Sequence, residues 1–337
     1  MNPRVLTPEQ IEQFITSGWT KIPQAFPREV AVSCQDFLWE KLSDPNNVSS
    51  KQLEHGILKN DPATWTLPMA FIGQGYNGAP FDACATQKLA DACSDLVGSG
   101  RWINEHEVGW WGHWPVNFAI GADQIWDVPA DEWHIDTPDD GTFISAPNQG
   151  SLAVCLFSKI GPRGGGTLIC EGSHQIAIRF MKENPGLTQR DFNHLCAESH
   201  PYLRALSGRD GGAGPGTDTG NARGVNAAAF VRKQAERLQN AVKTERISRF
   251  MDEVHTDEWG TKLRVVEITG EPGDVFLAHP FMFHSPSFNH SGVPRFMCNR
   301  KTPLFEPMQL QRADAAEYSA LEESIRRALE PVGMAAV

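Results

Sequence analysis

The sequence has no excess of positive charge, no long apolar run and no apolar leader, and each absence argues against one class of protein. It carries 30 Lys and Arg against 41 Asp and Glu, for a formal net charge of −11, which argues against general binding to nucleic acid or anionic membranes. No stretch approaches the roughly 18 uninterrupted apolar residues of a transmembrane helix, so we expect no membrane span. The segment Met1 to Gln13 is polar and lacks a signal-peptide core, so we expect no secretory leader.

The chain also lacks paired cysteine motifs. Its seven cysteines are scattered and contain no Cys-x-x-Cys pair, which argues against a disulfide framework and a zinc site. We therefore expect reduced thiols in a cytoplasmic protein. What is present is ordinary globular composition: 337 residues with 40% hydrophobic and 21% charged content. This is enough for a sizeable core, and a single β-barrel elaborated with helices fits the length as well as two domains do.

Local patterns predict helices first and strands later. Thr7-Pro8-Glu9-Gln10 has the capping residues of a helix start, and further helices are predicted at about 27–41, 83–96, 175–183 and 313–329. Residues 42–82 are rich in Asn, Pro and Gly, and we predict mostly loop there. Strands are predicted at 19–23, 108–120, 132–137, 151–160, 167–171, 262–269, 274–279 and 295–302. Several short strands with Gly and Pro turns indicate a sandwich or a jelly roll.

One glycine-rich stretch stands apart from these elements. Residues 207–224 cannot pack a core, and they are predicted to form either a mobile surface insertion or a lid over a site. The following predicted helix, about 226–254, carries six basic residues, which we interpret as a solvated face; a grip on a phosphate-bearing substrate is the alternative. The basic residues are Arg232, Lys233, Arg237, Lys243, Arg246 and Arg249.

The segment Glu132 to Pro138 contains the pair His134 and Asp136. In an extended strand, residues i and i+2 point to the same side, so both side chains can reach one metal ion. They would supply two of the three ligands of a 2-His-1-carboxylate triad, the arrangement of non-haem Fe(II) oxygenases. Alone, His-x-Asp is a weak signal, since it also occurs in solvated loops.

A second histidine and an arginine strengthen this interpretation. Residues 273–284 offer two candidates for the third ligand, His279 and His284, and Arg295 follows downstream. An arginine suits a carboxylate because its planar fork bonds both oxygens, and the far carboxylate of 2-oxoglutarate is such a partner.

With these residues the chain resembles the phytanoyl-CoA dioxygenase (PhyH) family of Fe(II)/2-oxoglutarate oxygenases. The resemblance runs almost end to end, and its pieces are the segments 6–10, 18–19, 22–23, 133–136, 165–168, 172–174, 273–274 and 279–284, with Asn289, Ser291 and Arg295. It implies an α+β, mainly β fold, with a double-stranded β-helix (jelly-roll, cupin-like) core and flanking helices at both ends. The whole chain, 1–337, would form one domain, with a helical part (1–105), a core (106–305) containing the 207–224 insertion, and a C-terminal helix (306–337).

The resemblance also implies roles for single residues. It selects His284 over His279 as the third metal ligand beside His134 and Asp136, and it assigns Arg295 to 2-oxoglutarate. Asn117 matches an asparagine that helps to hold this cosubstrate, whereas the lysine of the same pattern is Ala119 here. A serine usual near the anchor is replaced by Pro286, and three hydroxyls are candidate substitutes: Ser285, Ser287 and Thr167.

Two further histidines have plainer explanations. His279 is interpreted as a core histidine or a group behind the metal ligands. His174, in Gly-Ser-His, is expected to cap the following helix.

The activity implied is hydroxylation or desaturation of a small or medium organic substrate, with Fe(II), 2-oxoglutarate and O2 consumed to give succinate and CO2. A carboxylate at Asp136 argues against halogenation, since the related halogenases have a small residue there. Two other classes stay open: a metal-dependent jelly-roll enzyme that uses no 2-oxoglutarate, and a non-catalytic ligand-binding module. The sequence does not identify the substrate, and it leaves the oligomeric state open, a homodimer included.

Overall fold

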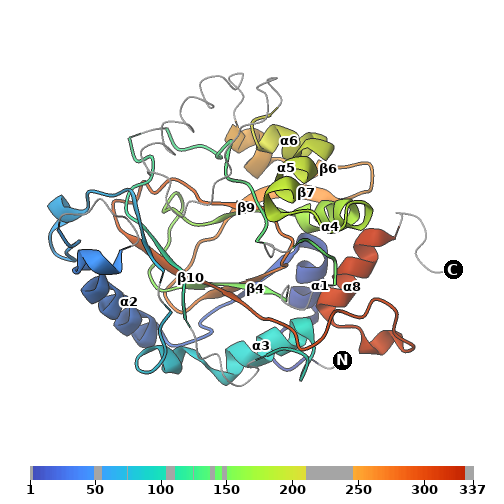
Figure 1. The fold of residues 1–337 in the computed structure, drawn as a ribbon, viewed down its shortest axis with the longest axis horizontal. Helices are drawn as coiled ribbons and strands as arrows, with labels where there is room; N and C mark the ends of the chain where they lie inside the picture. The colour runs from blue at the N-terminus through green and yellow to red at the C-terminus, as the bar shows by residue number, and fades with distance from the viewer. Residues whose placement is uncertain are drawn as a thin grey trace.

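Two antiparallel β-sheets form the centre of the molecule, and helices surround them (Figure 1). The computed structural model describes residues 3–48, 55–73, 75–103, 111–123, 125–136, 141–145, 150–209 and 246–330. The larger sheet has the order β1 (Trp19–Ile22), β8 (Val275–Ala278), β4 (Leu152–Leu156), β10 (Arg295–Lys301), β3 (Trp114–Asn117), β2 (Met69–Ile72). The smaller sheet has the order β6 (His255–Thr256), β7 (Lys262–Glu267), β5 (Leu168–Glu171), β9 (His284–Ser285).

Strands that are neighbours in these sheets are distant in the sequence. β1 pairs with β8, and β10 pairs with both β3 and β4, all antiparallel. The predicted fold class is confirmed: this is an α+β protein with a two-sheet, jelly-roll core.

The space between the sheets holds its own apolar cluster. Along β4, Val154 belongs to this inner cluster, whereas its neighbour Cys155 belongs to the larger core on the opposite face. This alternation is that of a strand with both faces buried. The inner cluster joins Met297 of the larger sheet to Ile169 of the smaller one, so side chains that share its face point into the jelly-roll interior.

The helices lie outside the sheets. They are α1 (Pro8–Ser17), α2 (Arg28–Leu42), α3 (Gln87–Val97), α4 (Ser173–Glu183), α5 (Gln189–Ser199), α6 (Pro201–Leu206) and α8 (Ala320–Leu329). Short helical turns are η1 (Pro45–Asn47), η2 (Pro62–Thr64), η3 (Phe81–Cys84), the π-helical η4 (Ser248–Asp252) and η5 (Ala315–Glu317). Figure 1 shows α1 and α8 side by side, with α4, α5 and α6 grouped next to the smaller sheet. Within the described ranges, no helix has the length and apolar character needed to cross a membrane.

Local capping chemistry decides several helix boundaries. The expected capping box at Thr7 is present, with Thr7 and Gln10 each bonding the backbone of the other. The helix predicted from residue 83 begins instead at Gln87, because the Thr86 hydroxyl accepts from the Leu89 N–H. The helix predicted from residue 313 begins at Ala320, because Ser319 and Glu322 form a second capping box.

Two other predictions of secondary structure differ from what the structure shows. The segment predicted as loop, 42–82, contains strand β2, which is held by β3. The strand predicted at 132–137 is only a single bridge at His134 among its described residues, because Glu132 adopts a φ of 61° that interrupts an extended chain.

The glycine-rich insertion falls mostly outside the described residues, as does most of the helix predicted at 226–254. The described end of that helix nevertheless contradicts its interpretation as a wholly solvated face. Arg246 is only 3% exposed, and its guanidinium donates to backbone carbonyls of Val128, Pro129, Ala205 and Leu206.

Candidate metal centre

Three side chains that can bind a metal ion converge at one end of the smaller sheet. They are His134, Asp136 and His284, and one ligand atom from each lies within 4.8 Å of the others. The Asp136 carboxylate is 3.7 Å from His134 Nε2 and 3.8 Å from His284 Nε2, and the two ring centroids are 4.4 Å apart. A single cation placed among these atoms can bond to all three.

Backbone pairing brings the two histidines together. The His134 N–H donates to the His284 carbonyl at 3.0 Å, and the His284 N–H donates to the His134 carbonyl at 2.9 Å. The two residues are therefore directly opposite in an antiparallel pair, with their side chains on the same face. His134 thus extends the smaller sheet beyond β9, and the bridge aligns the imidazoles.

Hydrogen bonds also orient each ring. His134 Nδ1 lies 2.6 Å from the Glu132 carbonyl, and His284 Nδ1 lies 3.0 Å from the Met282 carbonyl. A carbonyl only accepts, so Nδ1 carries the proton in both rings and Nε2 presents a lone pair. The protein thereby selects the tautomer that metal-binding histidines need, with the second nitrogen held by the backbone.

The charges of the cluster suit a divalent cation. Burial lowers the pKa of His284 to about 4, so this imidazole is neutral and available as a ligand near pH 7. Burial opposes ionisation of Asp136, but the two imidazoles and Lys301 outweigh it and hold the pKa of this carboxyl below its usual range. The site therefore offers two imidazole nitrogens and one carboxylate, the donor set of the facial triad.

Side chains from two helices fix the backbone beside both histidines. Between His134 and Asp136, the Ile135 N–H donates to Asn193 Oδ1 at 2.9 Å, and the Ile135 carbonyl accepts from Asn193 Nδ2 at 3.3 Å. Next to His284, the Phe283 N–H donates to the Ser173 hydroxyl at 2.9 Å.

These supporting residues were not predicted from the sequence. Gln189 also donates to the Ile135 carbonyl, at 3.0 Å, and it lies one helical turn before Asn193 on the same face of α5. The sequence signal for them is a pair of amide side chains four residues apart on one helix. This spacing does not identify the backbone groups to which the amides bond.

Arg295 is a buried cation without a described counter-ion. It is 2% exposed, and Nη1 donates to the Pro115 carbonyl at 3.2 Å, while Nε has no hydrogen-bond partner. Burial lowers the pKa of this guanidinium to about 9, so it remains charged near pH 7. Burying a charge in this way is costly, and an anion that accepts from the fork would offset the cost.

Strand register places Arg295 and His284 on the walls of one interior. Arg295 and Met297 share a face of β10 because they are two residues apart, and Met297 belongs to the cluster between the sheets. Ile169 of the same cluster is directly opposite His284 in the β5–β9 pair. The candidate metal ligands and the unpaired guanidinium therefore face the same space.

The residues predicted to bind the cosubstrate line the same interior, but their side chains differ in the hydrogen bonds that they already make. Asn117 is directly opposite Arg295 in the β3–β10 pair. Its amide donates to the Ser287 carbonyl at 3.1 Å and accepts from the Ile120 N–H at 3.2 Å. Among the described residues, the Thr167 hydroxyl bonds only the Met297 sulfur, at 3.5 Å, a weak acceptor.

The other two candidate hydroxyls are used by the backbone. Ser285 Oγ donates to the Asp131 carbonyl at 3.1 Å, and Ser287 Oγ donates to the Gly166 carbonyl at 2.6 Å. Of the three substitutes considered, Thr167 therefore has the hydroxyl most available to a ligand.

His279 and His174 form a separate buried pair, with ring centroids 4.8 Å apart. His279 Nδ1 accepts from the Phe281 N–H, and among the described residues this histidine is not part of the metal cluster. His174 does not cap α4 as expected, since its Nε2 bonds the Ile15 carbonyl and ties α1 to the core.

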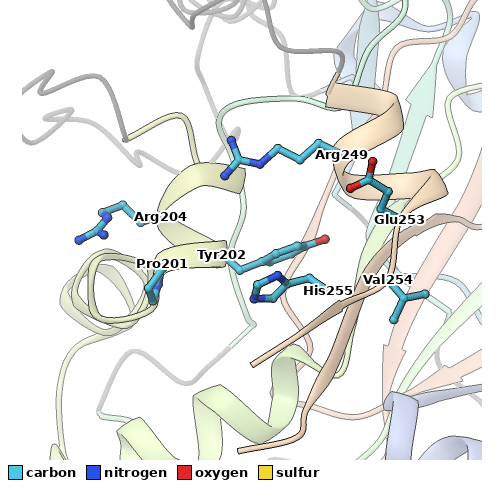
Figure 2. A pocket seen from close by; sticks show the side chains of 7 residues that line it. All are labelled: Pro201, Tyr202, Arg204, Arg249, Glu253, Val254 and His255. Carbon is cyan, nitrogen blue, oxygen red and sulfur yellow. The ribbon is translucent and has the colours of Figure 1, made fainter. Parts of the chain in front are cut away.

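A hollow of about 420 Å³ lies elsewhere, between α6 and η4. Figure 2 shows the Tyr202 ring beside His255, with Arg204, Arg249 and Glu253 around it. The described lining includes none of the candidate metal ligands, so the hollow is distinct from the metal centre.

Comparisons with known proteins give a likeness of fold only. No family model matches the chain, and no curated protein matches it in sequence. Similar solved structures include EctD from S. alaskensis in its apo form (14% identity, 89% of this chain and 77% of that one, TM-score 0.44). Others are the non-haem α-ketoglutarate-dependent carbocyclase SnoK from nogalamycin biosynthesis (10%, 89% and 85%, 0.45) and HygX from Streptomyces hygroscopicus with nickel and 2-oxoglutarate bound (14%, 87% and 85%, 0.39).

The fold and the site together define a class of protein. The chain is a jelly-roll protein whose interior gathers a two-histidine, one-carboxylate cluster and a buried arginine that has no counter-ion among the described residues. At the identities and TM-scores above, any assignment of function depends on the chemistry of this site.

Proposed function

We propose that the protein is an Fe(II)/2-oxoglutarate-dependent dioxygenase that hydroxylates or desaturates a C–H bond of a small or medium organic substrate, a specialised metabolite. The observation that carries the proposal is the pairing, in one interior, of the three-ligand cluster with the unpaired Arg295 guanidinium. A metal site alone would also serve an isomerase or a binding module. A buried cation facing the same space adds a site for a dicarboxylate cosubstrate.

In this proposal His134, Asp136 and His284 hold the metal through two Nε2 atoms and one carboxylate oxygen. When bound there, iron would supply the oxidising chemistry with 2-oxoglutarate and O2. The chain contributes fixed geometry: the His134–His284 bridge and the two Nδ1 bonds orient the rings before any ligand arrives.

Arg295 would hold the far carboxylate of 2-oxoglutarate. The Pro115 carbonyl accepts from Nη1 and helps to fix the guanidinium plane, while Nε is left to donate to the ligand. Thr167 would add a hydroxyl donor to the same carboxylate, and Asn117 would keep the wall beside Arg295 in place. Because Arg295 is buried, the charge pair forms away from water, where it is strong.

The overall reaction converts substrate, 2-oxoglutarate and O2 into hydroxylated substrate, succinate and CO2. One oxygen atom of O2 enters the alcohol and the other enters the new carboxylate of succinate. The protein's contribution is to position the target C–H and to exclude water from the interior.

We extend the proposal to a single domain of the phytanoyl-CoA dioxygenase type that spans residues 1–337 and acts in the cytoplasm.

The test is the visible charge-transfer band expected when Fe(II) and 2-oxoglutarate are added together without oxygen. We expect the band in the wild-type protein and its loss in His284→Ala. His279→Gln is the matched control, because this histidine is also buried and lies outside the cluster, and it should keep the band.

Admission of oxygen should then yield succinate in the wild-type protein. A band that survives His284→Ala but disappears in His279→Gln would move the third ligand to His279. Absence of both band and succinate in the wild-type protein would refute the proposed function.

A further inference from the structure

The residue between the two metal ligands of the His-x-Asp pair is held from outside the sheets. Ile135 is fully buried, and both of its backbone polar groups are bound by α5. The Asn193 amide takes both groups, since it accepts from the N–H and donates to the carbonyl. Asn193 is itself only 5% exposed, so these bonds form in the core, away from competing water.

The hydrogen bonds from Asn193 to Ile135 take the place of bonds that a neighbouring strand would make. His134 bonds the backbone of His284, but the chain does not continue as a ladder, and at the next residue the helix amide occupies the place that a neighbouring strand would take. The direction of the chain as it leaves His134 and enters Asp136 is therefore set by α5.

Among the described residues, one further contact is made by the backbone of Asp136. Its carbonyl lies 3.5 Å from Lys301 Nζ, a long and exposed contact. The carboxylate lies near Nε2 of both histidines, and a rotation of the peptide at Ile135 would move it away. The separation of the ligand atoms in the cluster is therefore sensitive to how the Ile135 peptide is held.

We propose that Asn193 is a positioning residue of the metal centre: by fixing both backbone groups of Ile135, it sets the placement of Asp136 relative to His134 and so the affinity for the metal. Gln189, one turn earlier on α5, supports the same carbonyl. The inference rests on the proposed function only in that it requires a divalent cation at the cluster; it does not depend on 2-oxoglutarate or on the substrate.

The test is the affinity for Co(II), used as the probe metal and titrated through its visible absorption under anaerobic conditions. Asn193→Leu keeps the size of the side chain and removes both hydrogen bonds. We expect it to weaken Co(II) binding by about 10- to 100-fold, the usual effect of losing a group that orients a metal ligand, with a changed Co(II) spectrum. Asn193→Gln retains an amide and should recover part of the affinity.

Gln175→Leu is the matched control. Gln175 also donates its amide from a helix to a backbone carbonyl, that of Thr16 at 2.9 Å, but it ties α4 to α1 and not to the metal segment. It should lower the melting temperature without changing the Co(II) affinity or spectrum.

The outcomes separate the two proposals. If the wild-type protein binds Co(II) and Asn193→Leu binds it equally well with an unchanged spectrum, the positioning role is wrong and the metal centre stands. If Asn193→Leu and Gln175→Leu lose affinity equally, the effect is general destabilisation and the positioning role is again wrong. Should Asn193→Leu not fold, Asn193→Gln decides, because a wild-type affinity and spectrum combined with a displaced Ile135 peptide in its crystal structure would overturn the inference. If the wild-type protein binds no Co(II), the metal centre and the inference both fail.

Discussion

Replacing Arg295 with methionine should stabilise the ligand-free protein while abolishing its response to 2-oxoglutarate. An arginine ordinarily has a pKa above 12, and burial lowers that of Arg295 to about 9. This difference corresponds to a cost of about 4 to 5 kcal/mol for keeping the charge in the folded protein. Methionine fills a similar volume without the charge, and we expect the free energy of unfolding to rise by about 1 to 4 kcal/mol.

The assay is thermal unfolding with and without 2-oxoglutarate, in the presence of a redox-inert divalent metal. In the wild-type protein, 2-oxoglutarate at about 100 times its dissociation constant should add about 2.7 kcal/mol and raise the melting temperature. Arg295→Met should start from a higher melting temperature in the absence of the cosubstrate, and should show no further rise when it is added.

Arg246→Met is the matched control, because Arg246 is equally buried but donates to four backbone carbonyls. Its removal takes a donor from all four carbonyls, of which those of Ala205 and Pro129 keep another, from the Gly208 N–H and the Trp133 indole. It should therefore destabilise the protein by about 1 to 3 kcal/mol and leave the 2-oxoglutarate response intact. A lower melting temperature for ligand-free Arg295→Met, or a 2-oxoglutarate shift of wild-type size in that variant, would refute the reasoning.

Three further substitutions test other parts of the site and fold. Thr167→Val should raise the KM for 2-oxoglutarate about fivefold, worth about 1 kcal/mol, with little change in stability because the hydroxyl bonds only the Met297 sulfur; the readout is succinate formation against cosubstrate concentration. Asn117→Leu should lower the free energy of unfolding, measured by urea denaturation, by about 2 to 3 kcal/mol, since two buried backbone groups lose their partners. Glu322→Gln tests pH dependence: burial raises the pKa of Glu322, but Arg312 and backbone N–H groups outweigh it and lower the pKa. The extra free energy of unfolding of the wild-type protein over Glu322→Gln should therefore be fully present near pH 7. It should be lost as the pH falls from about 4.3 through the lower pKa of the folded state. Urea unfolding at several pH values will measure this difference.

Local sequence patterns predicted those elements whose boundaries depend on nearby residues. The Thr7 capping box fixes the start of α1, and the strand predicted at 295–302 corresponds to β10, which ends within a residue of its predicted limit. Strand β2 was missed because its pairing with β3 lies far away in the sequence.

The residues of the candidate site also divide into those that the sequence predicts and those that only the fold reveals. His134, Asp136 and Arg295 are candidates because their side chains suit a metal and a carboxylate, and the family resemblance selects His284 over His279. The Asn193 bonds to Ile135 were not predictable, since an asparagine on a helix has no preferred distant partner. Arg246 was misread for a similar reason: the carbonyls that bury it come from separate segments that converge only in the fold.

The central claim is that one cation is held by His134, Asp136 and His284 while Arg295 holds the far carboxylate of 2-oxoglutarate in the same interior. A crystal grown anaerobically with Mn(II) and 2-oxoglutarate tests it most directly, through the anomalous signal of the metal. We predict a single strong peak among the two Nε2 atoms and the Asp136 carboxylate, with 2-oxoglutarate extending from it to the Arg295 guanidinium. A peak bound by other side chains, or a cosubstrate whose far carboxylate lies away from Arg295, would contradict the account.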